Sequence, residues 1–75
     1  MKEVGNLLTL RELRVDLGWS MPKLAKEAGV SSRTVFRAER GEKLSALNAK
    51  KIADALSRGY AREIKVSEIV GLNVQ

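Results

Sequence analysis

The sequence contains neither cysteine nor histidine. Without cysteine the chain can form no disulfide bond and no thiolate metal site, and without histidine it lacks the commonest general base and the commonest zinc ligand. No segment approaches the roughly 20 consecutive apolar residues of a membrane span, and the first residues show no signal-peptide pattern. We therefore expect a chain that is not an enzyme, binds no metal or other cofactor, and makes no contact with a membrane.

Positive charge exceeds negative charge, and the excess is uneven along the chain. The chain has 75 residues, which is enough for one domain only, and its net charge is +5. Residues 1–19 have no net charge, residues 20–44 have +3 and residues 45–75 have +2. A basic excess in the middle of a small domain favours a polyanionic partner, nucleic acid first. An ordinary solvated surface of mixed charge would also fit, because 31% of the residues are charged.

Helical spacing recurs along the chain, whereas strand signals are nearly absent. Apolar residues recur three and four positions apart in each segment, as on the buried face of a helix. Each segment opens at a residue that can cap a helix and closes near a glycine. We expect four helices and a short fifth one around residues 66–70, and therefore an all-α fold. The helices are expected to open at Thr9, Ser20, Ser31 and about Ser45, with Thr9 and Ser31 as caps, and the fourth helix should reach about Ser57. The glycines expected after helical stretches are Gly18, Gly29, Gly41, Gly59 and Gly71.

Residues 20–35 have the pattern of a helix-turn-helix, in which two short helices are joined by a tight turn. Ala25 is small enough for the two helices to cross closely. Gly29 supplies the turn, and Val30 and Val35 can anchor the second helix through a hydrophobic staple. A helix-turn-helix pattern on its own is a weak signal.

Further positions extend this pattern in one register along most of the chain. They are Leu13-Arg14, Leu24-Ala25, Gly29-Val30-Ser31, Thr34-Val35, Glu39, Gly41, Ile52-Ala53 and Ala55-Leu56. With them the chain resembles the Cro/phage-repressor (XRE) family of helix-turn-helix DNA-binding domains over about residues 8–57. The resemblance implies a compact repressor-like domain, residues 1–75, whose second and third helices form the helix-turn-helix. It further implies a transcriptional regulator that binds a specific double-stranded DNA sequence with its third helix in the major groove. We expect such a protein in the cytoplasm, associated with the nucleoid.

The third helix is expected to carry the base contacts. An arginine donates two hydrogen bonds to O6 and N7 of guanine, the commonest specific contact in the major groove. The resemblance implies that Ser32, Arg33 and Arg37 read bases. Phe36 can touch a thymine methyl group or pack under a neighbouring loop, and the sequence leaves both open. Helical spacing predicts an outward face made of Arg33, Phe36, Arg37 and Arg40, with Ser32 at the exposed N-terminal end of the helix.

Residues near the ends of the second and third helices are expected to contact DNA phosphates. Main-chain amides around Ser20 and Met21 can bind a phosphate oxygen through the helix dipole. Many family members carry glutamine where Met21 stands, and methionine cannot make that side-chain contact. Lys23, Arg40 and Lys43 are further candidates, although each would also fit an ordinary surface cation.

Arg14 and Glu39 are expected to form a structural ion pair. In the family, the matching positions often join the first helix to the third through a partly buried pair. A free carboxylate on the recognition helix would repel DNA, and a buried charge needs a partner of opposite sign. Trp19, the single tryptophan, is expected to plug the core where the first two helices meet.

The C-terminal extension, residues 58–75, departs from the family pattern. It has more apolar residues than a short tail needs, so it either completes the core of the domain or forms a dimer contact. Domains of this family usually bind palindromic sites as dimers, and we expect a homodimer at least on DNA. Two alternatives stay open: an antitoxin that holds a toxin through this extension, and a protein-interaction module that meets an acidic protein through its basic face. Salt-dependent binding to duplex DNA separates the interaction module from the other two.

Overall fold

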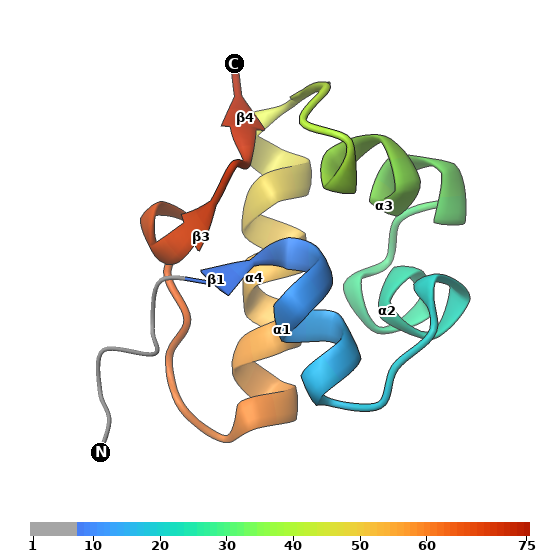
Figure 1. The fold of residues 1–75 in the computed structure, drawn as a ribbon, viewed down its shortest axis with the longest axis vertical. Coiled ribbons are helices and arrows are strands. Elements are labelled where there is room, and N and C mark those ends of the chain that lie inside the picture. The colour runs from blue at the N-terminus through green and yellow to red at the C-terminus, as the bar shows by residue number, and fades with distance from the viewer. Residues whose placement is uncertain (1–7) are drawn as a thin grey trace.

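Four α-helices make up most of residues 8–75, the part of the chain that this computed structural model describes (Figure 1). The predicted all-α class is confirmed, because the strands are only two residues long. The helices are α1 (Leu10–Asp16), α2 (Met21–Ala28), α3 (Ser32–Glu39) and α4 (Ala46–Tyr60). The strands are β1 (Leu8–Thr9), β2 (Lys43–Leu44), β3 (Ile69–Val70) and β4 (Asn73–Val74), and a 3₁₀ turn, η2, covers Val66–Glu68.

All four helices begin where the sequence predicts. In each, the capping side chain accepts a hydrogen bond, at 3.1 Å, from the main-chain amide three residues further on. These bonds satisfy amides that a helix leaves without a partner in its first turn. At α1 the arrangement is reciprocal, because Glu12 Oε1 accepts from the amide of Thr9 at 2.9 Å. The four capping residues are Thr9, Ser20, Ser31 and Ser45.

The end of α4 differs from the prediction. Glycines with positive φ follow α1, α2 and α3 as expected, but Gly59 lies inside α4, which continues past Ser57 to Tyr60. A Cβ atom on Gly59 would lie 2.8 Å from Leu17 Cδ1 and 2.9 Å from Trp19 Cη2. The role of this glycine is therefore close approach, since it lets α4 pack against the residues that connect α1 to α2.

The core runs along α4, with α2 and α3 on one side of this helix and the C-terminal tail on the other (Figure 1). Trp19 is partly buried and packs against the core from the α1–α2 connection, which agrees with its predicted role as a plug. Tight packing at this depth makes each side chain sensitive to changes in volume. The largest fully buried side chains are Leu24, Val35, Ile52 and Leu56.

Of the expected fifth helix, only the 3₁₀ turn η2 is present, because residues 69–70 are extended. After η2 the chain is extended, and it pairs in parallel with two distant segments, Ile69 opposite Leu8 in β1 and Val74 opposite Leu44 in β2. These partners provide ladder hydrogen bonds that local sequence does not reveal, and β-branched residues suit the extended form. Ile64 and Ile69 are each only 4% exposed, so the tail completes the core of its own domain.

Tyr60 joins the end of α4 to α1. Its hydroxyl oxygen lies 2.8 Å from the main-chain oxygen of Leu13 and 2.9 Å from Oδ2 of Asp16, so the two acceptors share its one hydrogen. Burial, followed by the hydrogen bond to Asp16 and its charge, raises the pKa of Tyr60 to about 12. The neutral phenol is therefore the form that the folded chain favours.

Candidate nucleic-acid interface

The turn between α2 and α3 is closed by main-chain hydrogen bonds to one small residue. The amides of Gly29 and Val30 donate to the oxygen of Ala25 at 2.9 and 3.0 Å. Ala25 is 3% exposed and has no bulk that would keep the two helices apart. On the inner side of α3, Val35 is fully buried. The helix-turn-helix therefore holds α3 against the core by one face and leaves its other face to solvent.

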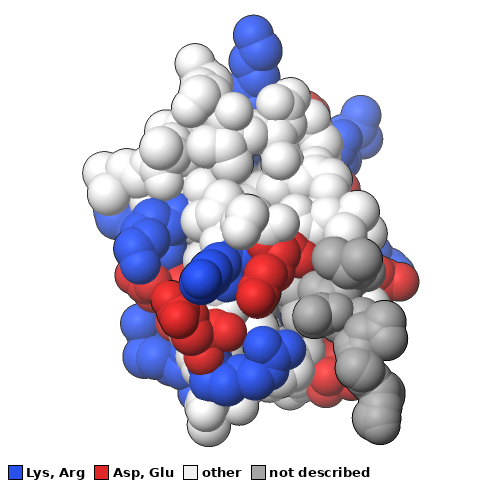
Figure 2. All heavy atoms as spheres, turned by 90° about the vertical axis from the view of Figure 1, so that its left-hand side faces the viewer, with Lys and Arg blue, Asp and Glu red and all other residues white. Residues whose placement is uncertain are grey.

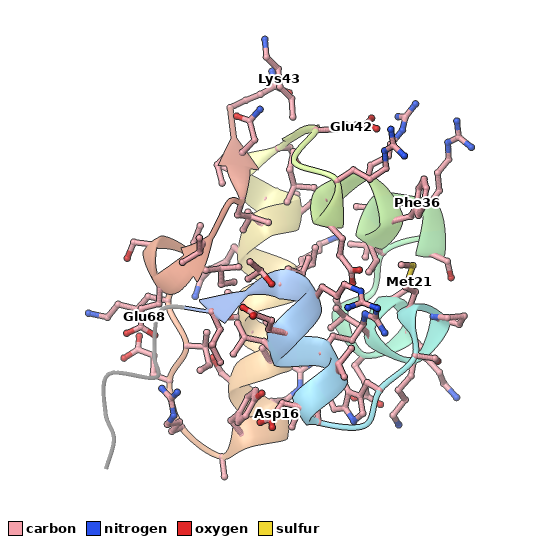
Figure 3. All side chains as sticks on the ribbon, viewed as in Figure 1. Asp16, Met21, Phe36, Glu42, Lys43 and Glu68 are labelled. Carbon is pink, nitrogen blue, oxygen red and sulfur yellow. The ribbon has the colours of Figure 1, made fainter. Side chains whose placement is uncertain are left out.

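The outward face of α3 carries the four residues predicted to contact bases. Phe36 is 46% exposed. Of the two possibilities that the sequence left open, its ring is therefore exposed on this face and is not packed under a loop. In Figure 3, Phe36 points away from the body of the molecule on the same side as Glu42. The four exposed residues are Ser32, Arg33, Phe36 and Arg37.

Arg14 and Glu39 form the predicted ion pair between α1 and α3. Arg14 Nε lies 2.5 Å from Glu39 Oε2, and Nη2 donates to Oε1 at 3.2 Å. A third donor, Nη1, bonds the main-chain oxygen of Trp19 at 2.9 Å. The two side chains are only 10% and 5% exposed. The pair therefore removes the Glu39 carboxylate from the solvent-facing side of α3, where it would repel a polyanion.

Glu42 is a residue of this face that the sequence analysis missed. Its Oε1 lies 3.4 Å from Arg37 Nε, and its Oε2 lies 3.3 Å from Arg40 Nε. The guanidinium carbon of Arg40 also lies 5.5 Å from the centre of the Phe36 ring, within the range of a cation–π contact. The available signal was the position of Glu42 directly after a helix-ending glycine, which brings it back over the last turn.

The residues of α2 that were predicted to contact phosphates already have partners within the protein. Ser20 caps the helix, and Met21 is partly buried against the core. Lys23 Nζ is 3.0 Å from Glu27 Oε2 and 5.8 Å from the centre of the Trp19 ring. The hydrogen bond from Lys23, and then its charge, lower the pKa of Glu27. A phosphate at this position would compete with Glu27 for the ammonium group.

The loop after α3 is held in place by the tail. Asn73 Nδ2 donates to the main-chain oxygen of Gly41 at 3.2 Å, and the amide of Gln75 donates to the oxygen of Leu44 at 2.9 Å. Lys43 is exposed on this loop, where β2 pairs with β4. The tail therefore fixes the course of the chain directly after the recognition helix.

A small polar hollow lies between α3 and the start of α4. It contains two cationic side chains and the N-terminal end of a 15-residue helix, whose dipole places positive potential there. An anionic group of phosphate size suits such a hollow. The lining residues are Thr34, Arg37, Lys43, Leu44, Ser45 and Asn48, around a volume of about 170 Å³.

The face on the side of the tail, opposite α3, has another charge pattern. Figure 2 shows Lys and Arg mixed with Asp and Glu in its lower half, and a largely uncharged upper half. The tail exposes two large apolar side chains, Val70 and Val74, which are 45% and 36% exposed. On the α3 side, by contrast, Arg33, Arg37 and Arg40 are exposed, and Glu42 pairs with the last two.

Comparison with known families agrees with this geometry. The family model for this helix-turn-helix matches residues 10–62, which spans all four helices. The chain belongs to the XRE family of helix-turn-helix domains. At the level of the family it is a DNA-binding regulator of transcription, and its partner is double-stranded DNA. The match ends shortly after α4, so the strands β3 and β4 of this helix-turn-helix protein lie outside the family pattern.

Neither a comparison with curated proteins nor one with solved structures found a significant match. Among residues 8–75, no helix has both the length and the apolar character needed to cross a membrane.

Proposed function

We propose that this protein binds a specific sequence in double-stranded DNA, with α3 in the major groove, and represses transcription by occupying its operator. The placement of Arg33 and Arg37 carries this proposal. Both are exposed on the outer side of a helix whose inner side is held by Val35 and by the pair of Arg14 with Glu39. A helix fixed in this way can hold guanidinium groups in register with base edges.

Each residue of the outward face has a proposed role. Arg33 and Arg37 each donate two hydrogen bonds to a guanine. Ser32, at the exposed first turn, donates or accepts a hydrogen bond with a base edge. Phe36 contacts a thymine methyl group, which its exposure permits.

Phosphate contacts on both sides of α3 fix its register on the duplex. We assign them to the main-chain amides around Ser20 and Met21, and to Arg40 and Lys43 beyond the other end. Lys23 contributes once a phosphate replaces Glu27 at its ammonium group. These contacts give affinity that falls with salt, because each neutralised phosphate releases counterions.

We propose that the protein binds a palindromic operator as a homodimer. One protomer offers few phosphate contacts, and a single small module binds weakly at physiological salt. Two copies place their recognition helices about 34 Å apart, one turn of the duplex. The uncharged face of the tail, with Val70 and Val74 exposed, is the surface that supports an interface between copies.

Selection of bound sequences from random duplex DNA tests the proposal most directly. We expect a recovered palindrome with guanines at equivalent positions in each half, and an affinity that falls steeply as salt rises. The spacing of the two half-sites measures the separation of the recognition helices in the dimer, and sedimentation of the complex gives the number of protein chains per duplex. A selection that returns no motif, or duplex affinity that is absent even at low salt, would contradict the proposal and favour the protein-interaction module.

The exposed valines of the tail support a second candidate, an antitoxin that binds its own promoter and holds a toxin through this surface. A toxin would cover Val70 and Val74 and leave α3 free. Loss of partner binding on Val74→Asp, with DNA binding retained, would separate this role from a simple repressor. In both cases the protein acts by binding, without catalysis, in the cytoplasm at the nucleoid.

A further inference from the structure

The end of α3 has a geometry that brings Glu42 over the last helical turn. The amide of Glu42 donates to the oxygen of Arg37 at 3.1 Å, and the amide of Gly41 donates to the oxygen of Ala38 at 3.1 Å. Gly41 has φ of +81°, in the left-handed region. Together these features make a Schellman motif, which commonly brings two apolar side chains into contact at the positions that Glu42 and Arg37 occupy. In this chain an acid and a base stand there instead.

The carboxylate of Glu42 contacts both arginines at the same end of the guanidinium group. In Arg37 and in Arg40 the closest nitrogen is Nε, the one nearest the main chain. This leaves the two terminal amino groups of each guanidinium to donate elsewhere, including the paired bonds that read a guanine. One carboxylate oxygen serves each arginine, so Glu42 separates the two cations while it restrains both.

Glu42 is itself restrained by the tail. The preceding main-chain oxygen, that of Gly41, accepts from Asn73, and the following residue, Lys43, pairs with Asn73 in the strand ladder. The loop that carries the carboxylate therefore cannot swing away without breaking contacts to β4. Since all three paired side chains are about half exposed, the two ion pairs contribute little to the stability of the fold. Their consequence lies in where the guanidinium groups are held.

We propose that Glu42 is a positioning residue that gives the protein part of its sequence specificity, by holding Arg37 in place for base reading and Arg40 in place for its phosphate contact. This inference rests on the proposed function, which places Arg37 in the major groove. A freely moving arginine pairs with any phosphate, whereas a restrained one binds well only where the base edge fits it. The negative charge also weakens the attraction to DNA of any sequence. Glu42 therefore lowers non-specific affinity and maintains specific affinity.

The test is Glu42→Gln, which keeps the shape of the side chain and removes its charge. Glu63→Gln is the matched control, because it makes the same charge change at an exposed site in the loop after α4, away from α3 (Figure 1). Affinity is measured for the selected duplex and for a scrambled duplex across a range of salt. We expect E42Q to bind the scrambled duplex more tightly, with a salt slope steeper by about one, and to bind the selected duplex no better. The ratio of the two affinities should fall by roughly fivefold to tenfold, while E63Q leaves it unchanged.

A second measurement asks whether Glu42 acts through Arg37. In an Arg37→Ala background, E42Q should lose most of its effect on discrimination at the base that Arg37 reads. The inference would be overturned if E42Q raised the affinity for both duplexes equally, or if its effect on discrimination were the same without Arg37. Either result would show that Glu42 acts only through its negative charge and not by positioning Arg37. If the wild type prefers the selected duplex and E42Q prefers it equally strongly, the inference about Glu42 is overturned and the proposed function stands. A wild-type protein without sequence preference overturns the proposed function and the inference together.

Discussion

Arg14 of α1 donates hydrogen bonds to the Glu39 carboxylate of α3 through Nε and Nη2, and its Nη1 donates to the main-chain oxygen of Trp19. The pair ties the recognition helix to the first helix and removes an acid from the DNA-facing side. Two buried charges are costly to bring together, but once together each depends on the other. The orientation of α3 and the charge of its outer face are therefore set by the same contact.

Breaking this pair should destabilise the fold strongly. We expect Glu39→Gln or Arg14→Ala to lower the free energy of unfolding by about 3–5 kcal/mol, because one charge is left buried without its partner. Urea denaturation followed by circular dichroism measures the change. Lys50→Ala is the control: it breaks an exposed pair with Asp54, at 2.9 Å, and should cost less than about 1 kcal/mol. Equal costs for the buried and the exposed pair would contradict this reading.

Removing Arg33 should change DNA recognition and leave the fold intact. We expect Arg33→Ala to lose about 1–3 kcal/mol of binding to the selected operator and to relax the preference at one base pair. Titration of the variant against operators with single base changes identifies that pair. Arg62→Ala removes an exposed cation from the loop after α4 and should keep the full preference. An Arg33→Ala variant with an unchanged sequence preference would remove Arg33 from the set of base-reading residues.

Gly59 should not tolerate alanine, although alanine is the better helix former. In an ordinary helix the exchange would stabilise by about 1 kcal/mol. At Gly59 the new methyl group would meet Leu17 and the Trp19 ring at under 3 Å, and overpacking of this kind costs about 1–3 kcal/mol. We expect Gly59→Ala to lower the melting temperature and to change the fluorescence of Trp19. Adding Leu17→Ala should relieve part of the cost, so a purely additive double variant would argue against the clash.

The stability of the fold should fall in strong alkali through Tyr60. Its pKa is about 12 in the folded chain and about 10 when unfolded. A raised folded pKa means that the stabilisation is complete below pH 10 and is lost as the pH rises through 12. Ultraviolet absorbance of tyrosinate follows this single tyrosine directly. The difference in unfolding free energy between the wild type and Tyr60→Phe should shrink over that interval. A tyrosinate transition near pH 10 in the folded protein would contradict the expectation.

The helix starts were predictable because a cap is a local contact. Each capping side chain bonds an amide three residues away, so the pattern of residues carries the whole interaction. The exposed face of α3 was predictable for a related reason. A helix with Val35 and Ala38 on its buried side must present Arg33 and Arg37 to solvent. The pair of Arg14 with Glu39 was expected only through the family resemblance, since the two residues lie 25 positions apart.

The misjudged features were those that depend on distant parts of the chain. Gly59 looks like a helix end in the sequence, but it serves contacts with Leu17 and Trp19. The expected fifth helix is reduced to the 3₁₀ turn Val66–Glu68, because the residues after it form β3 and pair with β1. The turn that carries Glu42 is local and follows from Gly41, but the contacts of its carboxylate depend on side-chain conformations that a residue pattern does not specify.

By itself the sequence determined the four helix starts, the helix-turn-helix and the arginines of α3, because caps and helical periodicity act within a few residues. Only the tertiary structure decided that the tail forms two short strands paired with β1 and β2, and that it fixes the loop carrying Glu42. Those outcomes depend on hydrogen bonds between segments more than 25 residues apart. Such contacts form only when the core brings these segments together, so residue patterns that span a few positions cannot predict them.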